Sequence, residues 1–297
     1  MKFYIVTPAY NSLLLLQRCM RSVADQVMHG VEVHHHVQDG GSTDGTIEWL
    51  QQWKLSCSDI SGYTFTYESR KDKSMYDAIN MAWSKLPLDA NVTAHLNCDE
   101  QYLPCALKEV AAIFLKDTKA EVVSTAFIII DAEDRYICHR RPVQATRLCS
   151  QVACELNTCS CFHKVETFVR HGIRFDLRYR VIGDMIMYRE LMNYGVKVRA
   201  YSNLITSSFA ITGKNLAWTA DLSSETDAAD ASVLPILLRF RKQLICWSNL
   251  RRRVNDLFCK NPREYSIYSA SDLFRTTKRI KYPTSHWGMR SVAVNED

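Results

Sequence analysis

Acidic and hydroxyl-bearing residues gather at four places in this chain, each beside a run that predicts a buried strand or a helix. Residues 7–11, 38–46 and 97–100 follow apolar runs, and Asp184 precedes a helical stretch. The carboxyl ends of parallel strands meet at one edge of a sheet, where α/β proteins bind ligands. Carboxylates at such an edge can hold a hard divalent cation, accept hydrogen bonds, or take a proton from a hydroxyl.

Five segments of the chain, taken in order, resemble the nucleotide-sugar domain of family 2 glycosyltransferases. They are Val-Thr-Pro-Ala-Tyr-Asn at 6–11, Gln-Asp-Gly-Gly-Ser-Thr-Asp-Gly-Thr at 38–46, and residues 68–80, 97–100 and 175–184. Each segment alone is unspecific, whereas their order over roughly residues 1–216 is specific. The resemblance implies a GT-A-type α/β fold and inverting, hexosyltransferase-type transfer from a nucleoside-diphosphate sugar.

The resemblance assigns the nucleotide to the first two segments. Thr7, Ala9 and Tyr10 fall on the positions that grip the base, although the same residues could form a plain strand-to-helix connection. Asp39 falls on the aspartate that contacts uracil, whose imide N–H matches an acceptor-only carboxylate. The alternative for Asp39 is a turn cap. UDP-sugars are therefore the expected donors.

Residues 68–80 resemble the family's third signature, and the matching positions are Asp72, Tyr76, Asp77, Ala78 and Asn80. The order Glu68-Ser69 inverts the usual pair, and Ser74 replaces a glycine. Asp72 and Arg70 are expected at the nucleotide, with Arg70 neutralising the pyrophosphate unless it belongs to an ordinary basic loop.

Asp99 is the expected metal ligand, because a divalent cation held by carboxylate oxygens stabilises a departing diphosphate. It matches the last aspartate of the family's D-x-D, and the resemblance therefore implies Mn²⁺ or Mg²⁺. Asn97 stands where the first acid would be, beside the nucleotide, and the missing charge predicts weaker metal affinity. Glu100 is a candidate for a further ligand, although its side chain is expected to point to the opposite face if the strand continues.

Asp184 is the expected catalytic base. Residues 175–184 resemble the family's F-D-x-x-Y/W-R-x-x-G/E-D stretch, in which the final aspartate deprotonates the acceptor hydroxyl. A structural alternative exists, since a carboxylate at a helix start is favoured by the helix dipole. Lys214, in a late T-G-x-N-L loop, is a further candidate for a phosphate contact.

Other functions find less support. A nucleotidyltransferase would need a glycine-rich loop after the first strand, and residues 9–12 do not form one. No G-x-x-x-x-G-K-S/T segment is present, which argues against a P-loop enzyme. The spacing of Cys154, Cys159, Cys161 and His163 matches no common zinc site. A catalytically degenerate family member that binds nucleotide or glycan as an assembly partner remains the alternative.

The elements that would position these residues alternate between strand and helix. Strands are predicted at 2–7, 32–38, 63–68, 93–96 and 121–130, and helices at 13–26, 46–53, 74–85, 185–193 and after Pro104. This order indicates a Rossmann-like, mostly parallel sheet flanked by helices, with residues 1–216 as the catalytic domain. Residues 217–297 are predicted to form a linker to 232, a basic amphipathic helix over 232–260, and an end without pattern.

Composition limits the partners and the location. A net charge of +5 over 297 residues is too small to indicate nucleic-acid binding, and no apolar run reaches membrane-spanning length. The chain enters its first strand at once and carries eleven scattered cysteines, so we expect reduced thiols in the cytoplasm. The basic helix could pack on the catalytic domain or lie on the inner face of the cell membrane, near a glycan or lipid-linked saccharide acceptor in polysaccharide assembly.

Overall fold

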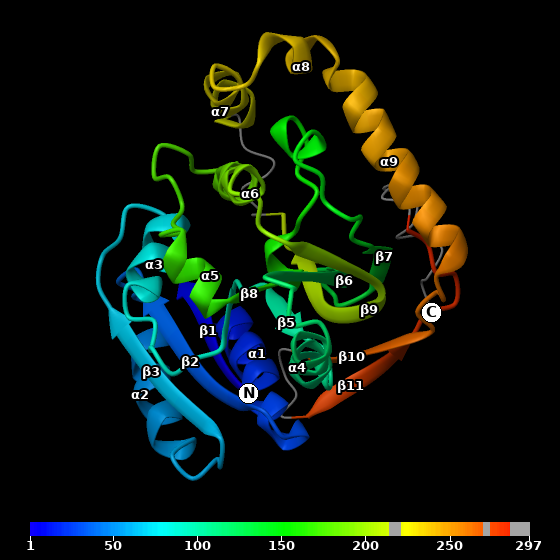
Figure 1. Cartoon of the computed structure of the whole chain (residues 1–297). Helices are drawn as coiled ribbons and strands as arrows, with labels where there is room; N and C mark the ends of the chain where they lie inside the picture. The colour runs from blue at the N-terminus through cyan, green and yellow to red at the C-terminus, as the bar shows by residue number, and fades with distance from the viewer. Residues whose placement is uncertain (214–220, 270–273, 286–297) are drawn as a thin grey trace.

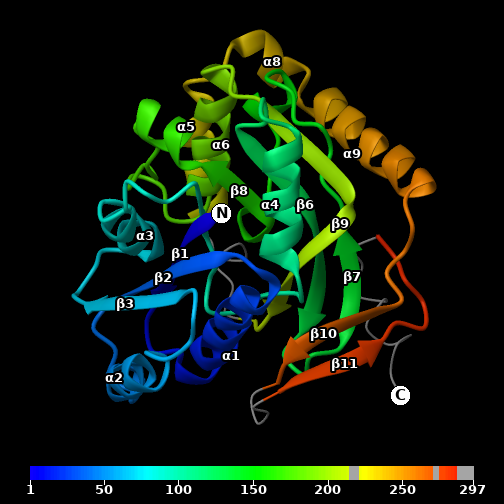
Figure 2. The same cartoon turned by 60° about the horizontal axis from the view of Figure 1, so that its bottom comes forward.

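The computed structural model describes residues 1–213, 221–269 and 274–285, and it is dominated by one curled sheet with helices on both faces (Figures 1 and 2). Its path of strands runs β3-β2-β1-β4-β8-β6-β9-β5, with β7 paired to β6. The first four strands are mutually parallel: β1 (Lys2–Ala9), β2 (Glu32–Asp39), β3 (Tyr63–Ser69) and β4 (Val92–His95). Their carboxyl ends therefore lie along one edge.

The second half of the sheet mixes directions. Strand β8 is antiparallel to both β4 and β6, whereas β6 and β9 are parallel to each other. Strand β5 pairs antiparallel with β9, and β7 pairs antiparallel with β6. The bounds are β5 (Glu100–Tyr102), β6 (Val122–Asp131), β7 (Tyr136–Arg140), β8 (Cys161–Lys164) and β9 (Val198–Ile211). Along one edge of β6, the end of β7 is followed by the start of β8, because Phe127 pairs with Arg140 and Ser124 pairs with Cys161.

Helices cover the two faces according to the alternation of side chains in the strands. Phe3 and Ile5 of β1 face α1 (Leu13–Ala24), α2 (Thr46–Ser56) and α4 (Ala106–Lys116). Tyr4 and Val6 face the other layer, which holds α3 (Met75–Trp83), α5 (Val165–Arg170) and α6 (Gly183–Asn193). Burying both faces explains why the central strands carry continuous apolar runs.

The predicted elements of the catalytic part are confirmed, with shifts of one to three residues at most ends. The predicted helix over 13–26 ends at Ala24 and continues as a 3₁₀ turn, η1 (Asp25–His29). Short 3₁₀ turns η2 (Cys149–Gln151) and η3 (Thr158–Ser160) lead into β8. The predicted α/β class, with a parallel first half of the sheet flanked by helices, is confirmed.

The predictions for the C-terminal region are partly wrong. The expected linker contains helix α7 (Asp221–Asp230), which buries Ala229 against Tyr179, Ile182 and Ile186. The expected single helix is two, α8 (Pro235–Arg239) and α9 (Arg241–Phe258), separated at Phe240. A division of the chain at residue 216 stays a prediction.

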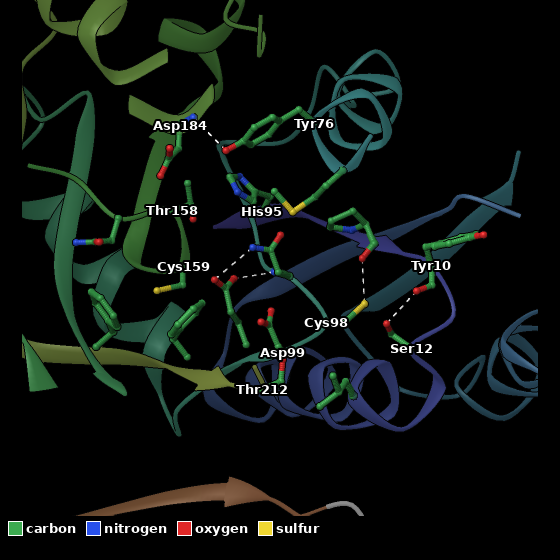
Figure 3. Close-up of a pocket in the computed structure, with 18 of the residues that line it drawn as sticks. Tyr10, Ser12, Tyr76, His95, Cys98, Asp99, Thr158, Cys159, Asp184 and Thr212 are labelled. Atoms are coloured by element: carbon green, nitrogen blue, oxygen red, sulfur yellow. Dashed lines mark hydrogen bonds between the residues drawn. The ribbon is translucent and has the colours of Figure 1, made fainter. Parts of the chain in front are cut away.

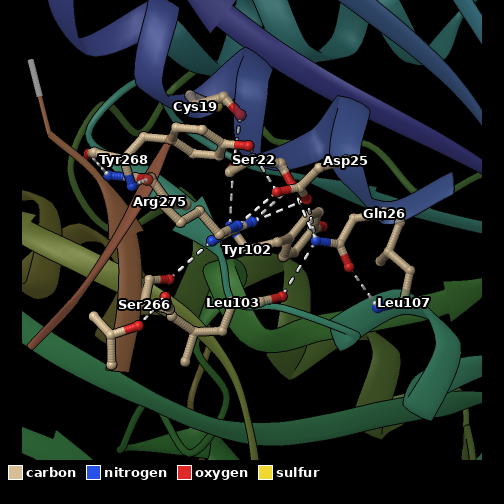
Figure 4. A network of polar contacts seen from close by, with 12 residues as sticks. Cys19, Ser22, Asp25, Gln26, Tyr102, Leu103, Leu107, Ser266, Tyr268 and Arg275 are labelled. Carbon is tan, nitrogen blue, oxygen red and sulfur yellow. Dashed lines mark hydrogen bonds and ion pairs between the residues drawn. The ribbon is translucent and has the colours of Figure 1, made fainter. Parts of the chain in front are cut away.

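The end of the chain was expected to lack a pattern, yet β10 (Glu264–Tyr268) and β11 (Arg275–Arg279) form an antiparallel hairpin. Side chains far apart in sequence hold it against α1 (Figure 4). Arg275 Nε lies 2.5 Å from Asp25 Oδ2, and the hydroxyl of Tyr268 donates to the same oxygen at 2.9 Å. The hairpin is thus held by tertiary contacts, which the local sequence pattern of residues 264–279 does not predict.

Candidate active site

A cavity of about 470 Å³ opens at the carboxyl ends of β1 and β4. Figure 3 shows Tyr10, Ser12 and Cys98 on one side of it and Asp184, Tyr76 and Thr158 on the other. Of the residues predicted from sequence, the cavity is lined by Tyr10, Asn97, Asp99 and Asp184. The structure thus brings the expected metal ligand and the expected base together, although they are 85 positions apart in sequence.

Residues 97–100 place three oxygen-bearing side chains on the cavity wall. The Glu100 carboxylate accepts a hydrogen bond from the Asn97 backbone N–H at 2.7 Å and lines the cavity beside Asp99. The strand does not continue, because β4 ends at His95 and the chain turns before β5 begins, and Glu100 accordingly faces the cavity. Burial and the nearby Asp99 carboxylate raise the pKa of Glu100 well above its usual range.

The chemistry of this group fits a hard divalent cation. The Asn97 Oδ1 atom is buried without a hydrogen-bond partner, next to two carboxylates that repel each other. Buried acceptors without donors are costly, and a cation satisfies them. Among the described residues no three His, Cys, Asp or Glu side chains form a complete metal cage. Asn97, Asp99 and Glu100 would accordingly supply part of a ligand set and leave the rest to a bound diphosphate.

Asp184 enters the cavity from the first turn of α6, and Tyr76 controls its position. The Tyr76 hydroxyl accepts from the Asp184 backbone N–H at 3.3 Å and donates to the Val181 carbonyl at 3.1 Å. A Cβ at Gly183 would lie 2.5 Å from the Tyr76 ring, so only glycine permits this packing. Tyr76 also stacks on Phe175, with ring centroids 4.4 Å apart.

The Asn80 side chain joins the two motifs that carry Tyr76 and Phe175. Its amide donates to the Phe175 carbonyl at 2.8 Å, and its carbonyl oxygen accepts from the Phe175 N–H at 2.9 Å. The third signature and the segment before Asp184 are therefore bonded directly to each other.

The electrostatics of Asp184 suit a general base. Burial raises its pKa from 3.8 to about 6, against the lowering effect of a backbone N–H of Met185, which donates to Asp184 Oδ1 at 2.7 Å. A carboxylate with a pKa near 6 is largely ionised at neutral pH and is more basic than an ordinary aspartate. The neighbouring His95 is neutral, because burial lowers its pKa to about 3.

Glu225 of α7 holds the loop that leads into Asp184. Its two carboxylate oxygens accept hydrogen bonds from the backbone N–H groups of Arg180 at 2.6 Å, Val181 at 2.9 Å and Ile182 at 3.1 Å. These N–H groups precede α6 and have no acceptor within the helix. Sequence reasoning missed Glu225 because it fell in the predicted linker, and no local pattern shows that this acid of α7 reaches the loop before α6.

Of the residues predicted to contact the base, Tyr10 lines the other side of the cavity, and Asp72 lies near Tyr10 outside the lining. Tyr10 is 63% exposed and available for stacking. The Asp72 carboxylate and the Tyr10 ring both lie against Gly40. A Cβ on Gly40 would be 2.5 Å from Asp72 Oδ2 and 3.3 Å from the Tyr10 ring, so the two side chains are close to each other. Burial and the carboxylates of Asp77 and Asp39 raise the pKa of Asp72.

Asp39 lies within its own loop and does not line the cavity. Its carboxylate accepts from the N–H groups of Gly41 at 2.9 Å and Ser42 at 3.0 Å, and from the hydroxyls of Ser42 at 2.5 Å and Ser69 at 2.6 Å. This is the turn-shaping role named as the alternative, and contact with a base stays a prediction.

The remaining predicted nucleotide residues also lie outside the cavity lining. The Thr7 hydroxyl is buried 2.9 Å from His35 Nε2, and Ala9 is buried with its carbonyl accepting from the Gly40 N–H at 2.8 Å. Arg70 is exposed on the loop after β3. Lys214 lies outside the described residues. The cavity residues that sequence reasoning missed include Arg140, Asn157 and Thr158.

Comparison with known proteins points to one family. A sequence model described as glycosyl transferase family 2 matches residues 4–190. No curated protein sequence matches the chain. The structure resembles S. aureus TarS 1-349 in complex with UDP, with a TM-score of 0.55 and 13% identity over 72% of this chain and 62% of that one.

A second similar structure is a mannosyltransferase from Pyrobaculum calidifontis in complex with GDP-Man and Mn²⁺. Its TM-score is 0.56 and its identity 16%, over 85% of this chain and 73% of that one. At such identities the likeness supports the fold, and the chain spans less than two thirds of the TarS fragment bound to UDP.

Proposed function

Because the chain belongs to glycosyl transferase family 2, we propose that it transfers a sugar, with inversion, from a UDP-sugar to a hydroxyl of a glycan or lipid-linked glycan. The observation that carries the proposal is the shared cavity, which joins an acidic group at the end of β4 to a basic carboxylate at the start of α6. Transfer needs both, since a diphosphate must leave as a hydroxyl loses its proton.

Asp184 acts on the acceptor. Its carboxylate takes the hydroxyl proton while the hydroxyl oxygen forms a bond to the anomeric carbon, and the bond from that carbon to the diphosphate oxygen breaks with its electrons leaving on UDP. Attack opposite the leaving group inverts the anomeric centre. Tyr76, Gly183 and Glu225 hold the loop so that the base faces the cavity.

Asn97, Asp99 and Glu100 act on the donor. They would hold Mn²⁺ or Mg²⁺, which neutralises charge on the departing diphosphate. Tyr10 and Asp72 would contact the base, with Arg70 near the phosphates and Asp39 shaping the loop between them. Support for a nucleotide-sugar donor comes from the similar structures, which hold UDP, UDP-GlcNAc, or GDP-Man with Mn²⁺.

The proposal is tested by the thermal stability of the protein with UDP, GDP and dTDP, each with and without Mn²⁺. A ligand that binds only the folded state stabilises it by about 2.7 kcal/mol at a hundred times its Kd. We expect a Mn²⁺-dependent rise with UDP in the wild type and its loss in Asp99→Ala. A rise in thermal stability with GDP alone would indicate a GDP-sugar as the donor in place of a UDP-sugar. No response to any of the three nucleotides would contradict the proposal.

The alternative is a degenerate member that binds without catalysis, and Asn97 in place of an acid favours it. Asp184→Asn separates the two functions. A catalytic protein binds UDP unchanged and loses sugar transfer in this variant, whereas a degenerate partner leaves glycan output in cells unaltered.

Helix α9 supports a location at a membrane surface. It meets the domain through polar residues: Ser248 and Arg251 bind Glu155, and Asn255 donates to Ser202 Oγ at 2.7 Å. Its apolar side chains face outward, with Trp247 54% and Phe258 82% exposed. Helix α9 thus contacts the domain through its polar side, while its apolar stripe faces away from the domain. Within the described residues no helix is long and apolar enough to cross a bilayer.

We propose that this outward stripe lies on an anionic lipid surface at the cytoplasmic face of the membrane. The stripe consists of Phe240, Trp247, Leu250, Val254, Leu257 and Phe258, and the exposed cations beside it are Arg239, Lys242, Arg253 and Lys260. Apolar side chains flanked by cations match a headgroup boundary that carries negative charge.

Vesicle sedimentation tests this location. We expect binding to phosphatidylcholine vesicles that contain phosphatidylglycerol, weakened by salt, and lost in Trp247→Ser/Phe258→Ser. Equal binding by the variant would contradict the proposal. So would a wild-type dimer that the same substitutions dissociate, since the stripe would then join two copies.

A further inference from the structure

Arg140 ends β7 and lines the cavity that also holds Asp184. The sheet register explains the position of Arg140. It pairs with Phe127 of β6, and three residues earlier on the same strand Ser124 pairs with Cys161, the first residue of β8, which follows η3. The hydroxyl of Thr125, between these points, donates to the Ser160 carbonyl at 3.3 Å. Arg140 and η3 are therefore neighbours, although 18 positions separate Arg140 from Thr158.

The guanidinium of Arg140 has no counter-ion in the described parts of the chain. Its Nε atom is buried without a hydrogen-bond partner, and the side chain makes no ion pair there. The Nε atom of the adjacent Arg141 likewise lacks a hydrogen bond, but Arg141 has a counter-ion in Asp256 and donates to the carbonyls of Ser202 and Lys260. A buried guanidinium donor left unsatisfied is costly, so Arg140 is shaped for a ligand acceptor.

Charge around Arg140 strengthens this reading. It is the only lysine or arginine among the described residues that line the cavity. A second guanidinium, that of Arg252, lies near it, and the pKa of Arg252 is lowered to about 10 by burial and then by Arg140, while Glu155 and Asp256 act in the opposite direction. Those two carboxylates already pair with Arg251 and Arg141, so an anion in the cavity would supply the counter-charge that Arg140 lacks.

Two polar side chains from the turn before β8 share this part of the cavity wall. Asn157 and Thr158 are half-buried, and neither side chain hydrogen-bonds to any residue that the structure describes. Figure 3 places Thr158 next to Asp184 and across the cavity from Tyr10. An amide, a hydroxyl and a guanidinium thus surround the space next to the base.

We propose that Arg140, with Asn157 and Thr158, binds a carboxylate or phosphate group of the acceptor, close to the hydroxyl that Asp184 deprotonates. The inference rests on the proposed transfer reaction, in which the acceptor occupies the Asp184 side of the cavity. It adds that the acceptor is anionic, because an uncharged saccharide would leave Arg140 without a counter-ion. The diphosphate of the donor belongs instead to the side of Asp99.

The test uses three probes that share one sugar ring: methyl glucoside, methyl glucuronide and methyl glucoside 6-phosphate. Their Kd values are measured on the full chain saturated with UDP and Mn²⁺, for the wild type, Arg140→Gln and Arg140→Lys. Arg279→Gln, which removes an exposed charge on β11, is the matched control. Undiminished UDP affinity in each variant shows that it is folded.

We expect the wild type to bind one charged probe about 10- to 100-fold more tightly than methyl glucoside, as is typical of a charge-assisted hydrogen bond. Which charged probe binds better identifies the anion as carboxylate or phosphate. Arg140→Gln should lose the preference without weakening methyl glucoside, Arg140→Lys should keep part of it, and Arg279→Gln should keep all of it.

Three results would overturn the inference. The first is a wild type that binds no charged probe more tightly than methyl glucoside, and the second is an Arg140→Gln variant that keeps the full preference for the charged probe. The third is a wild type that binds UDP-glucuronate more tightly than UDP-glucose while Arg140→Gln does not. The last would assign the charge to the donor. Failure of the proposed function can be told apart from failure of this inference. In that case the wild type would not bind UDP in the presence of Mn²⁺.

Discussion

Replacing Asp184 by asparagine removes one ionisable group and leaves the shape of the side chain almost unchanged. Burial raises the pKa of this carboxyl from 3.8 to about 6, so folding disfavours its charged form. Each pKa unit is worth about 1.36 kcal/mol, and the penalty above pH 7 is therefore about 3 kcal/mol. Because the side chain is partly open to the cavity, we expect asparagine to recover about 1–3 kcal/mol.

The pH dependence has a definite sign. A carboxyl whose folded pKa is raised costs stability at high pH, and that cost falls as the pH drops below about 6 and disappears below 3.8, where the group is protonated in both states. We expect Asp184→Asn to exceed the wild type in free energy of unfolding at pH 8 and to match it at about pH 3. Transfer activity should fall by about 10²- to 10⁴-fold, the usual contribution of a general base.

Urea unfolding at the two pH values and initial rates with saturating donor measure both effects. Asp176→Asn is the control: hydrogen bonding to Arg178 lowers the pKa of Asp176, so its loss should cost stability at pH 8. Wild-type kcat should also rise with pH along a limb near 6. Unchanged kcat in Asp184→Asn would refute its role as the base, and unchanged stability at pH 8 would refute the desolvation argument.

Three further predictions concern the same site. Gly183→Ala should cost about 1–3 kcal/mol in unfolding free energy and reduce kcat, since its Cβ would meet the Tyr76 ring at 2.5 Å; unaltered kcat would contradict this packing role. Glu225→Gln should lower kcat with little change in donor KM, whereas the exposed control Asp227→Asn should not, as steady-state kinetics would reveal. Mn²⁺ affinity, measured by calorimetry, should increase with pH because the raised pKa of Glu100 makes metal binding release a proton; a pH-independent affinity would argue against Glu100 as a ligand.

The core of the fold could be predicted because each element follows a local rule. Period-2 and period-3.6 apolar patterns locate β1–β4 and α1–α4, and alternating strands and helices imply parallel pairing. Element ends shift by a few residues because capping depends on neighbours. Ser74, for example, caps α3 by accepting from the Asp77 N–H at 3.3 Å, where a relative would carry glycine.

The C-terminal region could not be predicted in the same way. Helix α7 has an acidic, weakly apolar sequence, and the residues that settle its place are Ala229 and Glu225, which meet α6 and the loop before it. For helix α9 the sequence left packing on the domain and a membrane surface both open, because periodicity does not show which side meets the domain; Arg141 and Glu155 bind its polar side. Such contacts join segments that are distant in sequence, and the periodicity of apolar residues within one segment does not predict them.

By itself, the sequence determined the family, the α/β class and the identity of the acidic residues, because these depend on residue types in a fixed order. Tertiary structure decided which of them share a cavity: it brings Asp99 and Asp184 together, turns Glu100 inward and encloses Asp39 within its own loop. It also decided that Arg140 lines the cavity that holds the base and makes no ion pair within the described residues. The physical reason is that burial, pKa and hydrogen-bond satisfaction belong to packed neighbours, and those are chosen only when the chain folds.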